Sequence, residues 1–216
     1  MSPMTRREFG LLTLSALALP KLANAQTVGG VRLGVQTYSF RELPKAPGGD
    51  ASAGIIDAMR TCGLTECELW SPQIEPAAPG GRGRTPEQVR ESREALRSWR
   101  VNTPLDHFRG IRDAFAKAGA SIYAFNYSFG GDFSDDEINR GFEMARALGA
   151  EIITASTNLT VAKRVAPFAE KHQMAVAMHN QSNTKDPNEF ATPESFAAAA
   201  ALSKYFKVNL DIGHFT

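Results

Sequence analysis

The sequence has few cysteines and almost no net charge. Its 216 residues include two cysteines, Cys62 and Cys67, and 24 Lys and Arg against 23 Asp and Glu. Two cysteines at this spacing form no disulfide framework, zinc knuckle or C-x-x-C redox pair, so we expect two small buried hydrophobic side chains. Because nucleic-acid grooves depend on a basic surface, the balanced charge argues against a nucleic-acid-binding protein. With 43% hydrophobic and 22% charged residues, the chain is expected to be globular.

The sequence has no apolar run long enough to form a stable membrane span. The run Leu11–Leu19 near the N-terminus is too short to cross a bilayer. Arg6 and Arg7 precede it as a twin-arginine motif, and Ala23-Asn24-Ala25 follows as a cleavage site. Residues 1–25 are therefore predicted to be a signal peptide, cleaved after Ala25. It would direct the folded protein through the twin-arginine export machinery to the periplasm or another extracytoplasmic compartment.

The sequence also lacks a G-x-G-x-x-G motif after its first predicted strand, which disfavours a dinucleotide-binding fold. Short apolar segments instead alternate with helical patterns, as in a parallel α/β sheet, either open or closed into a barrel. Helix starts are indicated by a hydroxyl residue before proline or by a capping box, and Pro167 predicts a kink or a late start in the helix it interrupts. The predicted strands are 31–38, 64–70, 121–127, 151–156, 174–179 and 206–212; the predicted helix starts are Thr85-Pro86, Thr103-Pro104, Ser134 with Glu137, and Thr192-Pro193.

Polar residues end each predicted strand on the same face. Alternate residues of a strand share a face, and polar side chains inside a sheet structure are costly unless they are paired or used. Six strands with polar ends in phase are typical of a barrel active site, so we predict a (β/α)8 TIM barrel of which about six β/α units are present. The residues in question are Gln36 and Tyr38, Glu68, Asn126, Thr154 and Ser156, His179, and Asn209 and Asp211.

Three motifs resemble the sugar phosphate isomerase/epimerase family of xylose-isomerase-like TIM barrels. They are Gly34-Val35-Gln36-Thr37-Tyr38-Ser39-Phe40, Glu68-Leu69-Trp70 and Asn209-Leu210-Asp211-Ile212-Gly213-His214. The resemblance covers residues 31–216 and implies one domain over residues 26–216. It implies a divalent metal ion at the barrel mouth, with Mn, Co, Zn and Mg as candidates, and a small sugar or polyol substrate. Asp211 matches a metal ligand of the family, and His214 matches the histidine that faces the metal-bound sugar.

The sequence departs from the family in two places. The fifth strand ends in His179 where family epimerases carry a glutamate that serves as ligand and acid/base. Imidazole suits Mn, Co, Zn or Fe better than Mg. The chain also reaches Thr216 directly after the sixth strand, so we expect roughly 60–70 further residues, with the seventh and eighth strands, in the natural protein. Residues 1–216 alone are expected to be inactive.

The resemblance and the strand ends together assign the candidate site residues. His179 and Asp211 are the predicted metal ligands, and Glu68 and His214 the predicted catalytic residues. The predicted substrate-binding residues are Gln36, Tyr38, Trp70, Asn126 and Asn180. Structural roles stay open: Asp211 as a helix cap, His179 as a neutral ring bonded to Asn180 or Asn183, and Glu68 as the partner of a basic side chain.

The function implied by the resemblance is metal-dependent isomerisation or epimerisation of a sugar or sugar phosphate through an enediolate. One alternative is a lyase or dehydratase that acts on a keto-sugar or keto-glycoside through the same intermediate. Another is a non-catalytic exported sugar-binding protein, which the missing fifth-strand glutamate favours. The sequence leaves room for a homo-oligomer.

Overall fold

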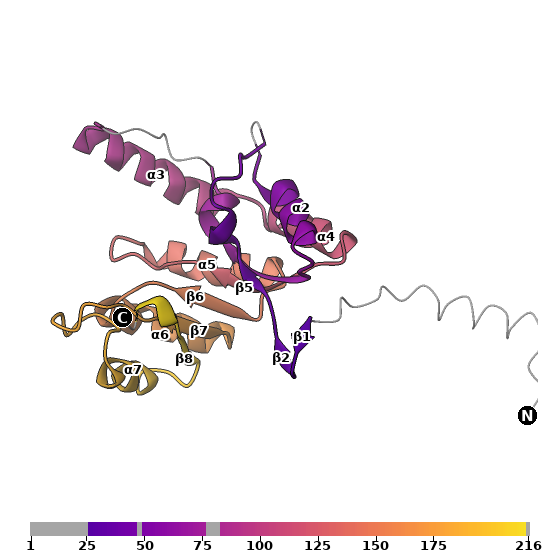
Figure 1. Ribbon diagram of the computed structural model, residues 1–216. Helices are drawn as coiled ribbons and strands as arrows, with labels where there is room; N and C mark the ends of the chain where they lie inside the picture. The colour runs from indigo at the N-terminus through magenta and orange to yellow at the C-terminus, as the bar shows by residue number, and fades with distance from the viewer. Residues whose placement is uncertain (1–25, 47–48, 77–82, 215–216) are drawn as a thin grey trace, which may run out of the picture.

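A computed structural model describes residues 26–46, 49–76 and 83–214 of the chain. The predicted signal peptide, with Arg6, Arg7 and Ala25, lies outside the described residues. The described part contains a small antiparallel hairpin, β1 (Thr27–Val28) and β2 (Val31–Arg32), followed by a six-stranded sheet (Figure 1). The strands of this sheet are β3 (Val35–Gln36), β4 (Glu66–Trp70), β5 (Ser121–Asn126), β6 (Ile152–Ala155), β7 (Ala175–His179) and β8 (Phe206–Asn209).

The order of the six strands identifies the sheet as a barrel wall. It runs β3-β4-β5-β6-β7-β8, and every neighbouring pair is parallel. Crossovers between parallel strands are right-handed, so a strictly sequential order places all the connecting helices on one face. A doubly wound sheet instead reverses its order and carries helices on both faces. The prediction of about six β/α units of a TIM barrel is confirmed.

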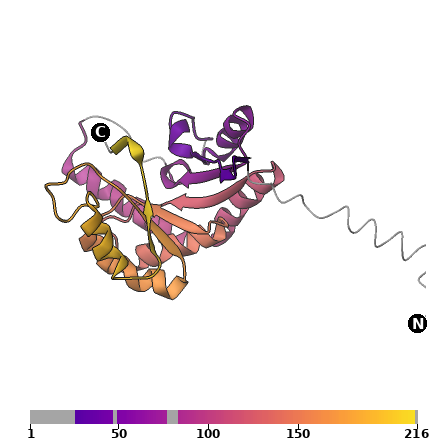
Figure 2. The same cartoon turned by 60° about the horizontal axis from the view of Figure 1, so that its bottom comes forward.

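The helices form a single outer layer along this sheet (Figure 2). Neighbours in this layer contact one another in the order α4, α5, α6 and α7, with α2 against α4 and α3 against α5. The two helices expected between the second and third strands are present as α3 and α4. The helices are α2 (Ser52–Thr61), α3 (Pro86–Asn102), α4 (Leu105–Lys117), α5 (Asp135–Ala147), α6 (Leu159–His172) and α7 (Pro193–Ala200).

The first and last predicted strands are longer than the strands in the structure. Residues 31–38 divide between β2, which pairs with β1 in the hairpin, and the two-residue β3. Tyr38 then lies in the 3-10 helix η1 (Thr37–Phe40). At the other end, β8 stops at Asn209, and Ile212 begins the 3-10 helix η3 (Ile212–His214). Asp211 therefore lies beyond its strand, and its position is set by local hydrogen bonds instead of the sheet.

Most helix starts are confirmed. Thr85 and Thr192 each accept a hydrogen bond from the third helical N–H and are followed by proline at the first helical position. The start at Thr103-Pro104 was wrong in detail: Pro104 is the cap of α4, and the Thr103 hydroxyl donates back to the Trp99 carbonyl. A late start at Pro167 was also wrong, because Asn158 caps α6 and the helix runs through the proline.

The prediction for the cysteines is half correct. Cys67 on β4 is fully buried, and burial raises the pKa of its thiol to about 12. Cys62, by contrast, is exposed at the end of α2, where the turn made by Gly63 at φ 68° leads the chain away from the helix. Both cysteines are free.

The capping box expected between Ser134 and Glu137 forms only on one side. The Ser134 hydroxyl accepts from the Glu137 N–H, but the Glu137 carboxylate is fully buried and bonds to arginines of α3 instead. Arg93 and Arg100 donate to it at 2.7–2.8 Å, and Arg100 also makes two bonds to the buried Glu75 carboxylate. This buried ion network fastens α3 and the end of β4 to the start of α5.

Among the described helices, none is both long and apolar enough to cross a membrane.

Candidate functional site

Four polar side chains from neighbouring strands bond to one another on the inner face of the sheet. Gln36 on β3, Glu68 on β4, Asn126 on β5 and Thr154 on β6 form this group, which we call the polar belt. One oxygen of Glu68, Oε1, accepts from Gln36 Nε2 at 2.8 Å, Thr154 Oγ1 at 2.5 Å and Asn126 Nδ2 at 3.2 Å. Asn126 Nδ2 also donates to Thr154 Oγ1 at 3.1 Å. The alternative role of Glu68, an ion pair, is not seen among the described residues.

A second group lies at the carboxyl ends of the last two strands. His179 ends β7, and Asp211 and His214 follow β8; we call these three the His/Asp cluster. His179 Nε2 lies 3.2 Å from Asp211 Oδ2, and His214 Nε2 lies 3.8 Å from the same oxygen. The two imidazole rings are 5.2 Å apart and nearly perpendicular. One ligand atom from each residue lies within 4.8 Å of the other two, a spacing at which they could share one cation.

Asp211 is held in place by the chain around it. Asn180 Oδ1 accepts from the Asp211 N–H at 2.6 Å, and Asn180 Nδ2 donates to the Asp211 carbonyl at 3.0 Å. The Gly213 N–H donates to Asp211 Oδ1 at 2.7 Å. That backbone hydrogen bond is the main cause that lowers the pKa of Asp211; burial opposes it, and the hydrogen bond with His179 lowers the pKa further. Asp211 is therefore an ionised carboxylate whose Oδ2 faces both histidines.

The donor set of the cluster is suited to a borderline transition metal. Two imidazole nitrogens and one carboxylate oxygen favour Zn, Mn, Co or Fe over Mg. Gln181 Nε2 lies 3.3 Å from His179 Nδ1, so the Gln181 amide fixes the ring and leaves Nε2 directed at Asp211. The side chains are open enough for ligand exchange, with exposed fractions of 15% for His179, 37% for His214 and 44% for Asp211.

The polar belt lies one layer deeper in the barrel than the His/Asp cluster. Asn126 pairs in register with Thr154, and Thr154 pairs with Ala177 on β7. His179 follows Ala177 by two residues on the same face, which corresponds to roughly 6–7 Å toward the mouth. The two polar groups therefore line consecutive levels of one interior surface.

Two aromatic side chains lie at the carboxyl end of β4, near the edge of the sheet that is opposite to β8 and the His/Asp cluster. Trp70 ends β4, and Tyr38 meets it edge to face at 4.9 Å between ring centres. The backbone N–H of Trp70 donates to the Thr37 hydroxyl, which anchors η1 to β4. Tyr38 is 44% exposed and carries the Arg41 guanidinium on its face. The exposed Tyr38 ring beside the half-buried Trp70 ring is suited to stacking against a sugar ring.

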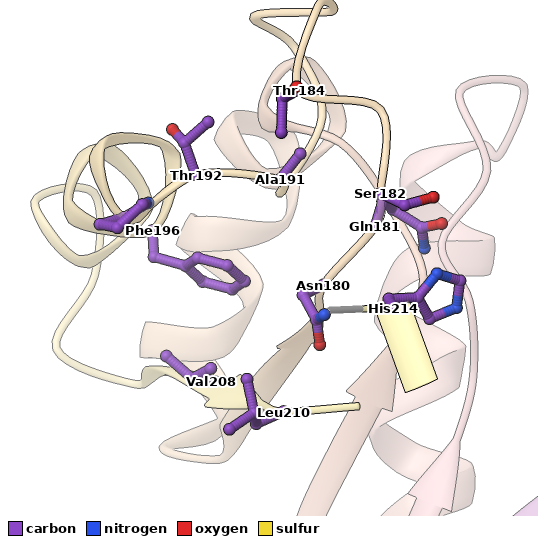
Figure 3. Close-up of a pocket in the computed structure, with 11 residues that line it drawn as sticks. Asn180, Gln181, Ser182, Thr184, Ala191, Thr192, Phe196, Val208, Leu210 and His214 are labelled. Atoms are coloured by element: carbon purple, nitrogen blue, oxygen red, sulfur yellow. The ribbon is translucent and has the colours of Figure 1, made fainter. Parts of the chain in front are cut away.

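A groove of about 410 Å³ adjoins His214 (Figure 3). Its polar wall includes Asn180 and Gln181, and its apolar wall is made by Phe196 with Val208 of β8 and Leu210, which follows β8. Val208 and Leu210 point away from the barrel interior and are more than half exposed. In a complete barrel this outer face of a strand is covered by a helix, so the apolar wall belongs to the packing surface of the barrel rather than to its mouth.

The structure brings most of the predicted site residues into two groups. Gln36, Glu68 and Asn126 lie in the polar belt, and His179, Asp211 and His214 lie in the His/Asp cluster. Asn180 lies beside the cluster, where both ends of its amide are used to hold Asp211. Sequence reasoning missed Gln181, whose only signal is its place directly after the fifth strand. It noted the phase of Thr154 without assigning that residue to the site.

Several solved structures share this fold. The chain is similar to a D-psicose 3-epimerase solved in the presence of D-fructose, with 11% identity and a TM-score of 0.55 over 84% of this chain and 64% of that one. It is similar to the probable 3-DHS dehydratase AsbF of Bacillus anthracis, with 14% identity and a TM-score of 0.54 over 85% and 64%. It is also similar to an L-ribulose 3-epimerase, with 12% identity and a TM-score of 0.52 over 86% of this chain and 62% of that one. These likenesses show that the chain has a TIM-barrel fold.

The chain resembles known proteins in its structure but not in its sequence. The sequence matches no family model and no curated protein. The chain spans less than two thirds of the length of the solved structures it resembles. At identities of 11–14%, the likeness establishes the fold alone.

Proposed function

We propose that this protein is a metal-dependent isomerase or epimerase of a small sugar. The observation that carries the proposal is the convergence of His179, Asp211 and His214 on one point at the carboxyl ends of β7 and β8. Active sites of TIM barrels lie at this end of the strands. The structural likeness to two sugar epimerases supports the same reading.

Each group of the site has a part in this proposal. His179 and Asp211 would hold a divalent cation, which as a Lewis acid would polarise a sugar carbonyl and make the adjacent C–H more acidic. His214 stands at the edge of the cluster with 37% of its side chain exposed, where it can move a proton to or from a bound sugar. Glu68 binds and orients the substrate from the layer beneath, and Tyr38 and Trp70 stack against it.

A lyase or dehydratase is the second candidate. The observation that favours it is His179 at the strand end where the family epimerases carry a glutamate, because a histidine that ligates the metal leaves the site without the carboxylate acid/base of those epimerases. The likeness to a probable dehydratase is consistent with it. Loss of water from a keto-sugar, followed by NMR, separates this activity from isomerisation. A non-catalytic sugar-binding protein would bind sugar with neither reaction.

We also propose that the protein acts outside the cytoplasm, after export in the folded state. The twin-arginine motif at Arg6 and Arg7 and the cleavage sequence ending at Ala25 support this location. A protein exported after folding can take up its metal in the cytoplasm, where the supply is controlled.

The test of the proposed function separates metal binding from turnover. In the full-length protein, Mn²⁺ binding is measured by calorimetry, and exchange of the C–H next to the carbonyl of a ketose is followed by NMR in D₂O. Asp211→Asn is expected to abolish both Mn²⁺ binding and exchange, whereas Cys62→Ser, on the exposed end of α2, should change neither. Exchange that survives the loss of Mn²⁺ binding would refute a metal-dependent reaction.

A further inference from the structure

The hydrogen-bond donors of the polar belt are partly used within it. Asn126 Nδ2 lies near both Glu68 Oε1 and Thr154 Oγ1, which are themselves 2.5 Å apart, so a single N–H of Asn126 points between these two oxygens. The Thr154 hydroxyl donates to Glu68, and one N–H of Gln36 does the same. One N–H of Asn126 and one N–H of Gln36 are left to donate to a ligand.

The acceptors of the belt, in contrast, are left open. Glu68 Oε2, Asn126 Oδ1 and Gln36 Oε1 have no partner among the described residues, although Glu68 is 93% buried and Asn126 92% buried. In the described part of the chain, the buried side-chain atoms that lack both a partner and contact with solvent are Ser52 Oγ and Gln73 Oε1. Glu68 Oε2 and Asn126 Oδ1 are therefore open to the barrel interior. A ligand at this level must donate hydrogen bonds.

The cations near this half of the barrel are engaged elsewhere. Arg32 forms a two-bond ion pair with Glu66, on the amino side of Glu68 in β4. Lys45 donates to the Glu75 carbonyl, and Arg41 lies on the Tyr38 ring beside Glu42. Lys207 donates to the Lys204 carbonyl. The Glu68 carboxylate thus has three neutral donors and no described basic side chain as its partner.

The charges of the two polar groups balance those of a divalent cation. Glu68 and Asp211 each contribute one negative charge, so a cation held in the His/Asp cluster would leave the interior close to neutral. A phosphate or carboxylate group entering this interior would add negative charge where no described arginine or lysine is free to pair with it. Burying an unpaired charge is strongly unfavourable.

We infer that the polar belt is a binding subsite for hydroxyl groups, and that the substrate is an uncharged keto-sugar rather than a sugar phosphate or sugar acid. This inference rests on the proposed function, because it places the ligand in the same interior. A sugar whose carbonyl lies at the cluster would present its next hydroxyls to the belt, which lies roughly 6–7 Å deeper. Thr154 is a specificity residue of this subsite, since its hydroxyl both orients Asn126 and bonds to Glu68.

The inference is tested by binding, without turnover, on the full-length protein loaded with Mn²⁺. The probes are matched pairs: D-fructose and D-fructose 6-phosphate, and D-xylulose and D-xylulose 5-phosphate. Calorimetry is expected to show that a free ketose binds at least about tenfold more tightly than its phosphate ester. Equal or tighter binding of both phosphate esters, or no binding of either free ketose to the Mn²⁺-loaded protein, would overturn the inference.

Variants of the belt distinguish this inference from the proposed function. Thr154→Val should weaken ketose binding severalfold and leave Mn²⁺ affinity unchanged, because the cluster lies on other strands. Gln36→Met, at a less buried position, should act in the same direction and guards against a folding defect in the first variant. If the ketose preference holds in the Mn²⁺-loaded protein while C–H exchange is absent, the hydroxyl subsite stands and the metal-dependent reaction fails. Unchanged ketose affinity in both variants would refute the role of the belt.

Discussion

Asn180 binds the backbone of Asp211 on both sides, accepting from its N–H and donating to its carbonyl. The Asp211 side chain is thereby left free, with Oδ2 directed at His179 and His214. An amide that fixes the main chain of a ligand acts on the metal site without touching the ion.

Replacing Asn180 by alanine should weaken Mn²⁺ binding by roughly 10–100-fold, because Asp211 loses both bonds that set its position. Calorimetric titration of the full-length protein measures the effect. Asn102→Ala serves as the control, since Asn102 bonds only within α3, to Ser98. An Asn180 variant with the affinity of the parent protein would show that Gly213 and the strand end suffice to place the carboxylate.

Glu137→Gln should destabilise the fold by about 1–3 kcal/mol at pH 7, because it removes the shared carboxylate of Arg93 and Arg100, which keep Asp132 and Glu75 as partners. Urea unfolding measures this loss. Arg109→Gln, which removes only an exposed pair with Asp106, should cost under about 1 kcal/mol.

The same variant predicts a pH dependence. Burial opposes ionisation of Glu137, but hydrogen bonds from Arg93 and Arg100 outweigh it and hold its pKa below the ordinary value of 4.5. The ionised carboxylate therefore stabilises the folded state above about pH 4.5, and this contribution is lost as the pH falls through the lowered pKa. The gap between parent and variant in unfolding free energy should narrow below pH 4.5. A gap that stays constant down to pH 3 would contradict the assignment.

Gly141→Ala should lower stability by about 1–3 kcal/mol, because a methyl group at this position of α5 would overlap the buried Tyr127 ring. Gly110→Ala offers a matched comparison on α4, where nothing lies near the added carbon, and should be neutral or stabilising by up to about 1 kcal/mol. Thermal unfolding of both variants checks the packing of the outer layer. Similar melting temperatures for the two would contradict the close approach of α5 to β5.

Changing Arg6 and Arg7 to lysine should retain the precursor in the cytoplasm, because the twin-arginine pair is read directly by the export machinery. Cell fractionation with mass analysis of the N-terminus detects both the location and cleavage after Ala25. The paired change Arg109→Lys and Arg112→Lys, on exposed positions of α4, should leave the exported yield unchanged. Equal periplasmic yields from all three forms would exclude this route.

Much of the barrel interior was predictable because a strand has a simple period. Gln36, Glu68 and Asn126 alternate with apolar neighbours, and the same alternation brought their side chains together. The starts of α3 and α7 were likewise predictable from Thr85 and Thr192, because each cap depends on a residue only three positions away.

The failures lie where distant parts of the chain compete with local patterns. Glu137 matches a capping box, yet arginines about 40 residues earlier take its carboxylate. Tyr38 fits the alternation of the first strand, but β3 pairs with β4 over Val35 and Gln36 only, and η1 follows directly. Asp211 continues the pattern of β8, whereas its bond to the Gly213 N–H turns the chain out of the strand.

The polar belt and the His/Asp cluster also differ in when they can form during synthesis of the chain. The belt needs residues 36–154 only, whereas the His/Asp cluster needs residues 179–214. On a chain that emerges from the ribosome N-terminus first, the hydroxyl-binding surface can be assembled before the ion ligands have been synthesised. If the cluster holds an ion, as we propose, its capture requires that the sixth strand has docked, so bound metal would mark the assembly of this part of the sheet.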